Sequence, residues 1–331
     1  MEQKCYNGDN ISDEERRKGM TKYAVGVDIG GTTVKIGLFV TNGTLIDTWE
    51  IITNTENNGE AVLPDIAASV KEKLEEKEIS LADVVGIGMG VPGPISPDGT
   101  VLKCVNLGWG IFNVEQKMEQ LIGLKAKAGN DANVAALGEM WQGGGKGYDS
   151  IVMVTLGTGV GGGVIINGQI LPGIHGAAGE IGHMPMCDDE TDTCGCGKKG
   201  CLEQYTSANG ITRVTRKYLE AHPEEVSTLR AVKELNSKEI FDAAKEGDPV
   251  ALKMVERTGD MLGKALAMIS CVVDPEAFVI GGGMSKAGAI LLDSIKEHYQ
   301  KYAFHASRDI EFKGAMLGNL AGIYGGVKMV L

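Results

Sequence analysis

The chain has 331 residues and a formal net charge of −12 at pH 7, from 44 acidic and 32 basic side chains. A chain of this length suits about two domains. The negative charge argues against a broad nucleic-acid-binding surface, and no segment holds the roughly 20 uninterrupted apolar residues of a membrane helix. The polar N-terminus is unlike a secretory signal. We therefore expect a cytoplasmic protein whose partners are small molecules, with no nucleic acid and no membrane among them.

The first 20 residues differ from the rest of the chain. They are polar and charged, they lack an apolar period, and Met20 stands directly before the first strand-like segment. We predict that residues 1–20 form a disordered polar extension and that the natural chain starts at Met20.

The next segments are typical of strands joined by glycine-rich turns. The pattern runs through a strand at 23–28, the turn Gly30-Gly31-Thr32-Thr33, a strand at 34–40, the hairpin signal Asn42-Gly43 and a strand at 45–52.

The same order of segments occurs a second time. It runs through an apolar strand at 151–156, a glycine turn at 157–163, a short strand at 164–166, the hairpin signal Asn167-Gly168 and a strand at 170–171. An internal duplication is the economical interpretation. It predicts two related α/β lobes whose glycine turns face each other across a nucleotide triphosphate.

The remaining segments follow from their apolar periods. We predict a helix at 61–78, a buried strand at 84–91, a helix at 134–141, a mostly helical part at 207–271, a strand at 278–280 and a final helix at 317–329. We expect this last helix to return to the first lobe, because the termini of duplicated lobes often lie near one another.

The two glycine turns have the features of a phosphate site. Backbone N–H groups at glycines can face a phosphate, and a threonine adds a hydroxyl donor, as in Gly30-Gly31-Thr32 and Gly157-Thr158-Gly159. Asp28, at the end of the first strand, can hold Mg²⁺ through water. The first turn is not a Walker A loop, since it lacks the G-x-x-x-x-G-K-[ST] pattern. One such turn alone is as readily an ordinary hairpin turn; the pair favours phosphate binding.

Asp131 is the candidate catalytic carboxylate. It lies in Gly129-Asn130-Asp131-Ala132-Asn133, where a short strand ends and a helix begins. An aspartate at such a place is usually the N-cap of the helix. Phosphoryl transfer, however, needs a carboxylate base beside the attacking hydroxyl.

Three of the seven cysteines lie in one short glycine-rich stretch. An odd number of cysteines argues against a secreted disulfide framework and favours metal ligation in a reducing compartment. Cys194, Cys196 and Cys201, with His183, form a set for a closed, structural Zn²⁺ site. Cys187 is a rival to His183 as the fourth ligand. Free thiols in a loop are the alternative without a metal.

Three polar residues are candidates for sugar binding because of their neighbours. Glu180 and Glu203 bracket the cysteine-rich stretch, and Asn106 lies in Val105-Asn106-Leu107-Gly108-Trp109. Each alone is an ordinary surface or turn residue. Grouped around a candidate base, they resemble a sugar site, because carboxylates and amides discriminate by bonding to hydroxyls.

These residues together resemble the ROK family (repressors, open reading frames and kinases), and within it the bacterial glucokinases. The resemblance runs from about Lys22 to the C-terminus. Its most specific part is the stretch 156–163 through Gly182-His183, followed by the pattern Cys-Gly-Cys-Gly-x-x-Gly-Cys.

The resemblance implies an α/β fold of the ribonuclease H-like, actin/hexokinase type, duplicated into two lobes with a central cleft. The smaller lobe would comprise residues 21–128 and 316–331, and the larger lobe residues 129–315 with the zinc loop. The family also suggests a homodimer.

The resemblance further implies an activity and its residues. The activity is ATP-dependent phosphorylation of glucose at the 6-hydroxyl to give glucose 6-phosphate and ADP, with Asp131 as the general base. The sugar contacts would be Gly93, Asn106, Asn130, Asp131, Glu180, His183 and Glu203. The ATP phosphates would lie on Gly30, Gly31, Thr32, Gly157, Thr158 and Gly159, with adenosine near Gly281, Gly282 and Gly283. His183 would both bind zinc and face the sugar.

Three alternatives stay open at this stage. The substrate can be another hexose, such as N-acetylmannosamine, fructose, allose or glucosamine. ROK repressors carry a winged helix-turn-helix before the first strand, and about 20 polar residues are too few for one. A sugar-binding protein without catalysis is disfavoured by the presence of Asp131 with both glycine turns.

Overall fold

The computed structural model describes residues 22–331, so the predicted extension at 1–20 lies outside the described residues. The strands are β1 (Tyr23–Ile29), β2 (Thr33–Val40), β3 (Leu45–Ile52), β4 (Val84–Val91), β5 (Thr100–Val101), β6 (Phe112–Asn113), β7 (Ala126–Asn130), β8 (Ile151–Leu156), β9 (Val160–Ile166), β10 (Gln169–Ile170), β11 (Ala277–Gly281) and β12 (Glu311–Gly314). The α-helices are α2 (Glu56–Gly59), α3 (Val62–Glu76), α4 (Val114–Ile122), α5 (Asp131–Gln142), α6 (Glu203–Thr206), α7 (Ala208–Ala221), α8 (Ser237–Lys245), α9 (Pro249–Val273), α10 (Ala289–Tyr302) and α11 (Ala321–Val330). Within this part of the chain, no helix combines the length and the apolar character that crossing a bilayer requires.

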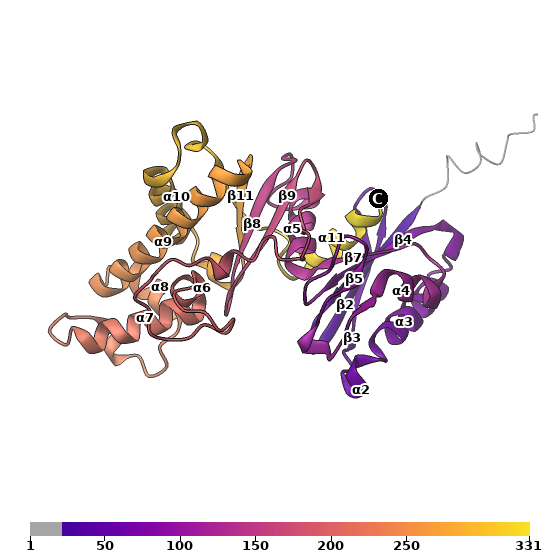
Figure 1. Cartoon of the computed structure of the whole chain (residues 1–331), viewed down its shortest axis with the longest axis horizontal. Helices are drawn as coiled ribbons and strands as arrows, with labels where there is room; N and C mark the ends of the chain where they lie inside the picture. The colour runs from indigo at the N-terminus through magenta and orange to yellow at the C-terminus, as the bar shows by residue number, and fades with distance from the viewer. Residues whose placement is uncertain (1–21) are drawn as a thin grey trace, which may run out of the picture.

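Two five-stranded sheets have the same topology. Their strand orders are β3-β2-β1-β4-β7 and β10-β9-β8-β11-β12. In each sheet the first three strands in the chain are antiparallel neighbours, and the two later strands run parallel to the first. Figure 1 shows the two sheets as the centres of two separate lobes. The duplication inferred from the repeated pattern of strands and turns is therefore confirmed.

The first sheet is covered on both faces. Apolar side chains of β1, β2 and β4 pack with α3 and α4 in one core, and Ala24 and Phe39, on the opposite face, pack with α11. Because both faces are covered, the central strands are almost continuously apolar instead of alternating. In Figure 1 the yellow C-terminal helix lies among the indigo elements of this lobe. The expected return of the last helix to the first lobe is confirmed.

Glycines allow α11 to lie directly on the sheet. A Cβ atom built on Gly26 would lie 1.8 Å from the carbonyl oxygen of Ile323, and one on Gly88 would lie 1.8 Å from that of Gly326. Neither distance is compatible with a side chain, so this contact requires glycine in the strands. The helix begins at Ala321, after a 3₁₀ turn at Gly318–Leu320, and not at residue 317 as predicted.

The second sheet separates two cores by simple alternation along β8. Val152 and Val154 face the helices of the large lobe, α7 to α10. Ile151 and Met153 face the opposite side, where α5 packs. Helix α5 covers the second sheet as α11 covers the first, and these two helices pack against each other between the lobes, as Figure 1 shows.

The predicted end of the second glycine turn is wrong, and the reason lies in the packing. The glycine turn predicted at 157–163 ends at Gly159, since β9 begins at Val160 and includes the following glycines. Gly163 lies under α5: a Cβ atom there would be 2.5 Å from the Cβ of Ala136. Gly163 serves helix–sheet packing, Gly162 lies against Gly179 and Ile181, and only residues 157–159 form the turn.

The longest helix, α9, begins where its sequence indicates. Asp248 accepts hydrogen bonds from the backbone N–H groups of Val250 and Ala251, and Pro249 occupies the first turn. An aspartate N-cap followed by proline is a strong helix start, because proline lacks the N–H that would be unpaired there.

Candidate active site

Asp131 occupies the first turn of α5, but it is not the N-cap. That role belongs to Asn130, whose Oδ1 accepts hydrogen bonds from the backbone N–H groups of Ala132 (3.1 Å) and Asn133 (3.2 Å). The Asp131 carboxylate accepts only from its neighbours, the N–H of Ala132 at 2.8 Å and the Asn130 amide at 3.0 Å. The carboxylate is therefore free of the capping role that was its most ordinary interpretation.

Two carboxylates at the end of the first sheet, Asp28 and Asp131, lie close together, and both have a raised pKa. The pKa of Asp131 is raised, mainly by burial, and the charge of Glu180 adds to this. Burial, then the charge of Asp131, raises the pKa of Asp28 to about 6, against a smaller lowering by Lys35. Gly90 lies between them, since a Cβ atom there would be 3.5 Å from both the Asp28 Oδ1 and the Asp131 Cα.

Other predicted sugar and phosphate residues surround this pair. The side-chain amide of Asn130 donates to the carbonyl of Gly93 at 3.3 Å. A Cβ atom on Gly31 would lie 4.0 Å from the Cβ of Asn106, an exposed residue. The structure therefore brings Gly31, Gly93 and Asn106 to the same end of the first sheet as Asp28 and Asp131.

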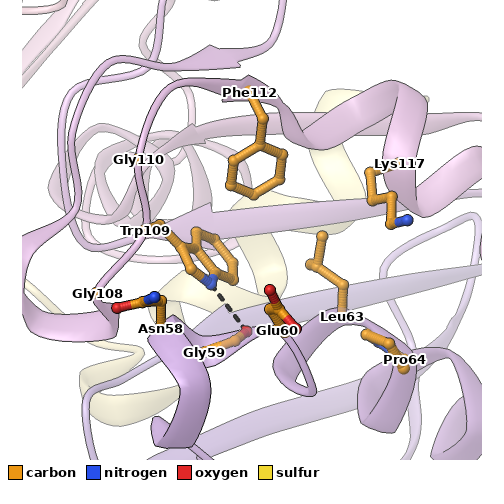
Figure 2. Close-up of a pocket in the computed structure, with 10 residues that line it drawn as sticks. All are labelled: Asn58, Gly59, Glu60, Leu63, Pro64, Gly108, Trp109, Gly110, Phe112 and Lys117. Atoms are coloured by element: carbon orange, nitrogen blue, oxygen red, sulfur yellow. Dashed lines mark hydrogen bonds between the residues drawn. The ribbon is translucent and has the colours of Figure 1, made fainter.

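The segment that carries Asn106 is fixed by a neighbouring tryptophan. Trp109 is 5% exposed, and its indole N–H donates to the carbonyl of Gly59 at 3.0 Å, as Figure 2 shows. A cavity of 570 Å³ lies beside this contact, lined by Gly108, Trp109 and Phe112 among others. None of the predicted site residues lines it. Trp109 thus positions the Asn106 segment and is not itself in the candidate site.

The large lobe groups the four predicted metal ligands. One donor atom each from His183, Cys194, Cys196 and Cys201 lies within 4.8 Å of the others. The His183 Nδ1 is 3.8 Å from the Cys194 sulfur, and the Cys196 and Cys201 sulfurs are 3.6 Å apart. The rival ligand Cys187 is not part of this group. A Cys₃His set of this kind fits a closed tetrahedral Zn²⁺ site.

The two predicted sugar-binding glutamates flank His183. Glu203 Oε1 is 3.6 Å from the His183 Nδ1 and 2.9 Å from the Cys194 sulfur, and Glu180 Oε2 is 3.9 Å from the His183 Nε2. The Nδ1 side of the imidazole therefore faces the cysteines, and the Nε2 side faces Glu180. Glu203 also approaches the phosphate turn, because a Cβ atom on Gly159 would lie 2.8 Å from its Oε2.

A charged network that the sequence did not reveal ties the zinc loop to α7. Arg213 donates to Asp192 (2.6 Å) and to Glu190 (2.7 Å), and the Tyr205 hydroxyl donates to Glu190 at 2.6 Å. The bond from Arg213 holds the pKa of Glu190 well below its usual range. No spacing in the sequence signals this pairing, since Arg213 lies about 20 residues away in a helix whose other charges are exposed.

The second phosphate turn adjoins the predicted adenosine segment. The N–H of Gly157 donates to the carbonyl of Gly159, and the N–H of Ala208, at the start of α7, donates to that of Gly157. Gly282 has φ +83°, and a Cβ atom there would lie 2.5 Å from the carbonyl oxygen of Leu156. Gly283 lines a cavity of 240 Å³ together with Phe241 and Met284.

The two predicted phosphate turns are not in direct contact. Thr53 binds the first turn, donating to Gly30 and bonding through its N–H to Thr32, whereas the second turn bonds only within the large lobe. Among residues 22–331, no hydrogen bond joins one turn to the other. The charge of Glu180, beside His183, raises the pKa of Asp131 at the end of the first sheet.

The ROK family profile matches residues 24–331. The chain belongs to the ROK family. It is 43% identical over 309 residues to a glucokinase of Halalkalibacterium halodurans, covering 92% of this chain and 94% of that one. It is 36% identical to a glucokinase of Thermotoga maritima, over 84% and 87% of the two chains. The crystal structure of a ROK family glucokinase from Streptomyces griseus in complex with glucose and AMPPNP superposes with a TM-score of 0.70 at 34% identity, covering 93% of this chain and 98% of that one.

This ROK chain therefore has the two-lobed actin/hexokinase-type fold expected from its motifs. The similarity extends over both lobes and not over one domain alone, since all three proteins are matched across more than four fifths of their length.

Proposed function

We propose that this protein transfers the γ-phosphoryl group of ATP to the 6-hydroxyl of glucose, giving glucose 6-phosphate and ADP. The observation that carries the proposal is the position of Asp131. Its carboxylate is not used as the N-cap, its pKa is raised, and the charge of Glu180, beside His183, contributes to that shift. The glucokinases with 36–43% identity over most of the chain support glucose as the acceptor.

Asp131 acts as the general base. A carboxylate with a raised pKa is a stronger base than an ordinary aspartate. As the sugar O6 attacks the γ-phosphorus, its proton passes to Asp131. The bond between the γ-phosphorus and the bridging oxygen breaks, and ADP leaves with the electron pair. The protein takes little part in covalent chemistry, so alignment of O6 with the γ-phosphate supplies most of the catalysis.

The sugar lies between the lobes in this proposal. Asn106, Asn130 and Gly93 of the first half would bond to its hydroxyls, with Glu180, His183 and Glu203 on the other side. Carboxylates and amides suit this role, because a site built to bond a hydroxyl rejects analogues that lack it. Closure of the lobes would bring O6 to the γ-phosphate and exclude water, the competing acceptor.

ATP would use both glycine turns. Its phosphates would contact Gly30–Thr32 and Gly157–Gly159, and adenosine would use the cavity beside Gly281–Gly283. Asp28 offers an oxygen ligand of the kind that Mg²⁺ prefers, through water, in a place where two neighbouring carboxylates need a compensating cation. Mg²⁺ bound with ATP would neutralise charge on the phosphate oxygens.

The metal in the large lobe would be structural zinc. Four protein ligands leave no position for substrate. The proposed function of zinc is to fix His183, whose Nε2 side faces Glu180 and the sugar. A cytoplasmic location and a homodimeric state are further parts of the proposal, suggested by the reducing environment that the cysteines favour and by the family resemblance.

Two experiments test the proposed function. A panel of hexoses, assayed by ADP release, should show glucose as the best acceptor; a larger kcat/KM for N-acetylmannosamine, fructose, allose or glucosamine would replace glucose in the proposal. Asp131→Asn should lower kcat by about 10²-fold or more while glucose binding weakens far less. Asp98→Asn, an exposed aspartate in a turn, is the matched control. Near-native turnover by Asp131→Asn would rule Asp131 out as the base.

A further inference from the structure

Glu139, near the end of α5, is a fully buried carboxylate, with 0% of its surface exposed. Such groups are almost always paired with a cation, yet no lysine or arginine within residues 22–331 lies at ion-pair distance from it. Its partners are backbone N–H groups instead. Oε2 accepts from Gly144 (2.8 Å) and Met316 (2.9 Å), and Oε1 accepts from Leu317 (2.7 Å) and Met316 (3.1 Å).

These N–H groups belong to the two segments that join the second sheet to the helices between the lobes. The chain enters this sheet from α5 through residues 143–150, and it leaves from β12 to α11 through residues 315–320. We call these segments the first and the second connection. Gly144 is in the first connection, and Met316 and Leu317 are in the second. A single carboxylate therefore binds both segments by which the chain enters and leaves the second sheet.

The two connections also touch each other directly. A Cβ atom on Gly144 would lie 2.1 Å from the carbonyl oxygen of Gly314, and one on Gly143 would lie 2.0 Å from the Glu139 Oε2. The backbones are thus packed with no side chain between them, around the Glu139 carboxylate.

We propose that Glu139 is the pivot of lobe movement and a positioning residue for Asp131. The two residues are eight positions apart on α5, about 12 Å along a helix with 1.5 Å rise per residue. One end of this helix carries the base, and the other end is bonded to both connections. The lobes open and close about this fixed point, so the path of Asp131 during closure is defined by Glu139. The catalytic part of this proposal rests on the proposed function.

The arrangement requires a carboxylate and not an amide. Three N–H groups bond to its two oxygens, and that of Met316 is shared by both. Glutamine has the same shape, but its NH₂ group would take the place of one oxygen. Gly144 then loses its acceptor in one orientation and Leu317 in the other, while Met316 keeps one. A buried donor left unpaired costs about 1–3 kcal/mol, so the substitution should loosen one connection in each orientation without changing the packing volume.

The test compares Glu139→Gln with Glu276→Gln. Glu276 also accepts from the first connection, from the N–H groups of Asp149 (2.7 Å) and Ser150 (2.8 Å), but both bonds end on one oxygen, Oε2. We expect Glu139→Gln to raise hydrogen exchange at least 10-fold at Gly144, at Leu317 or at both. Glu276→Gln should leave exchange at residues 149–150 close to that of wild type, because the amide oxygen can take the place of Oε2 and keep both bonds. Turnover of glucose should fall about 10-fold in Glu139→Gln and stay within twofold of wild type in Glu276→Gln.

The outcomes separate this proposal from the proposed function. Unchanged exchange in both connections of Glu139→Gln would overturn the pivot even if the wild type phosphorylates glucose. A wild type that does not phosphorylate glucose would overturn the proposed function, while the exchange result would still decide the pivot. If Glu139→Gln does not fold, Gly144→Ala, which displaces the Gly314 carbonyl, should raise exchange in both connections; an effect confined to residues 143–146 would overturn the pivot.

Discussion

Replacing Asp28 by asparagine should stabilise the protein at alkaline pH while abolishing its activity. The pKa of Asp28 is raised from 3.8 to about 6, first by burial and then by the charge of Asp131. Ionising this residue therefore costs the folded state more than the unfolded state. Asparagine keeps the shape and removes the charge.

The size of the stability change and the pH range over which it occurs follow from the pKa shift of Asp28. Well below pH 3.8 both states are protonated, and Asp28 has no effect. Between pH 4 and 6 the unfolded state loses its proton first, so stability falls as pH rises, and above pH 6 the loss is complete. A shift from 3.8 to about 6 corresponds to about 3 kcal/mol, at 1.36 kcal/mol for each pKa unit. At about 2.1 cal/mol/K per residue, that raises Tm by about 5 °C if the chain unfolds as one unit.

The assay is thermal unfolding of wild type and Asp28→Asn without nucleotide or Mg²⁺, at pH 4 and pH 8. We expect a higher Tm for the variant at pH 8 and a much smaller difference in Tm at pH 4. Asp98→Asn is the control with the opposite sign, since Ser96 and Thr100 lower the pKa of Asp98 by hydrogen bonding; its removal should not stabilise the protein at pH 8. An Asp28→Asn variant whose Tm is not raised at pH 8, or is raised equally at both pH values, would refute the reasoning.

Three further predictions concern ligands. Gly157→Ala should raise the KM for ATP and leave Tm unchanged, because a Cβ atom there meets nothing within 4 Å. Gly30→Ala should raise the KM for ATP and also lower Tm, because its Cβ would lie 2.8 Å from the carbonyl oxygen of Thr33. Enzyme kinetics and calorimetry distinguish the two variants. Purified protein should contain about one zinc per chain, and Cys196→Ala should lose it and weaken sugar binding with ATP binding intact, as checked by elemental analysis and titration; a zinc-free, fully active wild type would contradict this. Glucose should reduce the radius of gyration in solution scattering, and an unchanged radius at saturating sugar would count against lobe closure.

The Arg213 network limits the effect expected from loss of zinc. The loop from Glu180 to Glu203 is polar and rich in glycine, so metal binding would supply much of its order. Glu190 and Asp192 are, however, also held by Arg213. We therefore expect loss of zinc to disorder the loop around Cys194–Cys201 more than the segment at 190–192. Hydrogen exchange of zinc-depleted protein measures this difference.

The sequence predicted the parts of this fold that rest on local patterns. Strands β4 and β8 have the predicted bounds, because short apolar runs ended by Pro92-Gly93 or by a glycine turn leave little freedom. The repeated strand–turn–strand order predicted the duplication. Boundaries that depend on contact with a distant element were missed. The sequence predicted that the glycines of β9 belong to a turn, and contact of Gly163 with α5 is visible only in the structure.

The same distinction between local patterns and contacts with distant elements holds for the candidate active site. Residue types and spacing were enough to propose Asp131 and the four zinc ligands, since carboxylates at strand ends and closely spaced cysteines have few other uses. Glu139 has no such signal, because a glutamate in a helix is normally exposed, and only the return of the chain at Met316 buries it. The capping role of Asn130 was equally hidden, as Asn130 and Asp131 are both good caps and only the geometry separates them.

The packing of α11 on the first sheet has a consequence for how the protein is made. Synthesis produces β1 first and the ten residues of α11 last. Until those residues emerge, Ala24 and Phe39 have no helix to cover them, so the amino-terminal lobe cannot complete its own core while the rest of the chain is being translated. A stop codon a few residues early would damage the lobe that was translated first. For the same reason a purification tag is safer at the N-terminus than after α11.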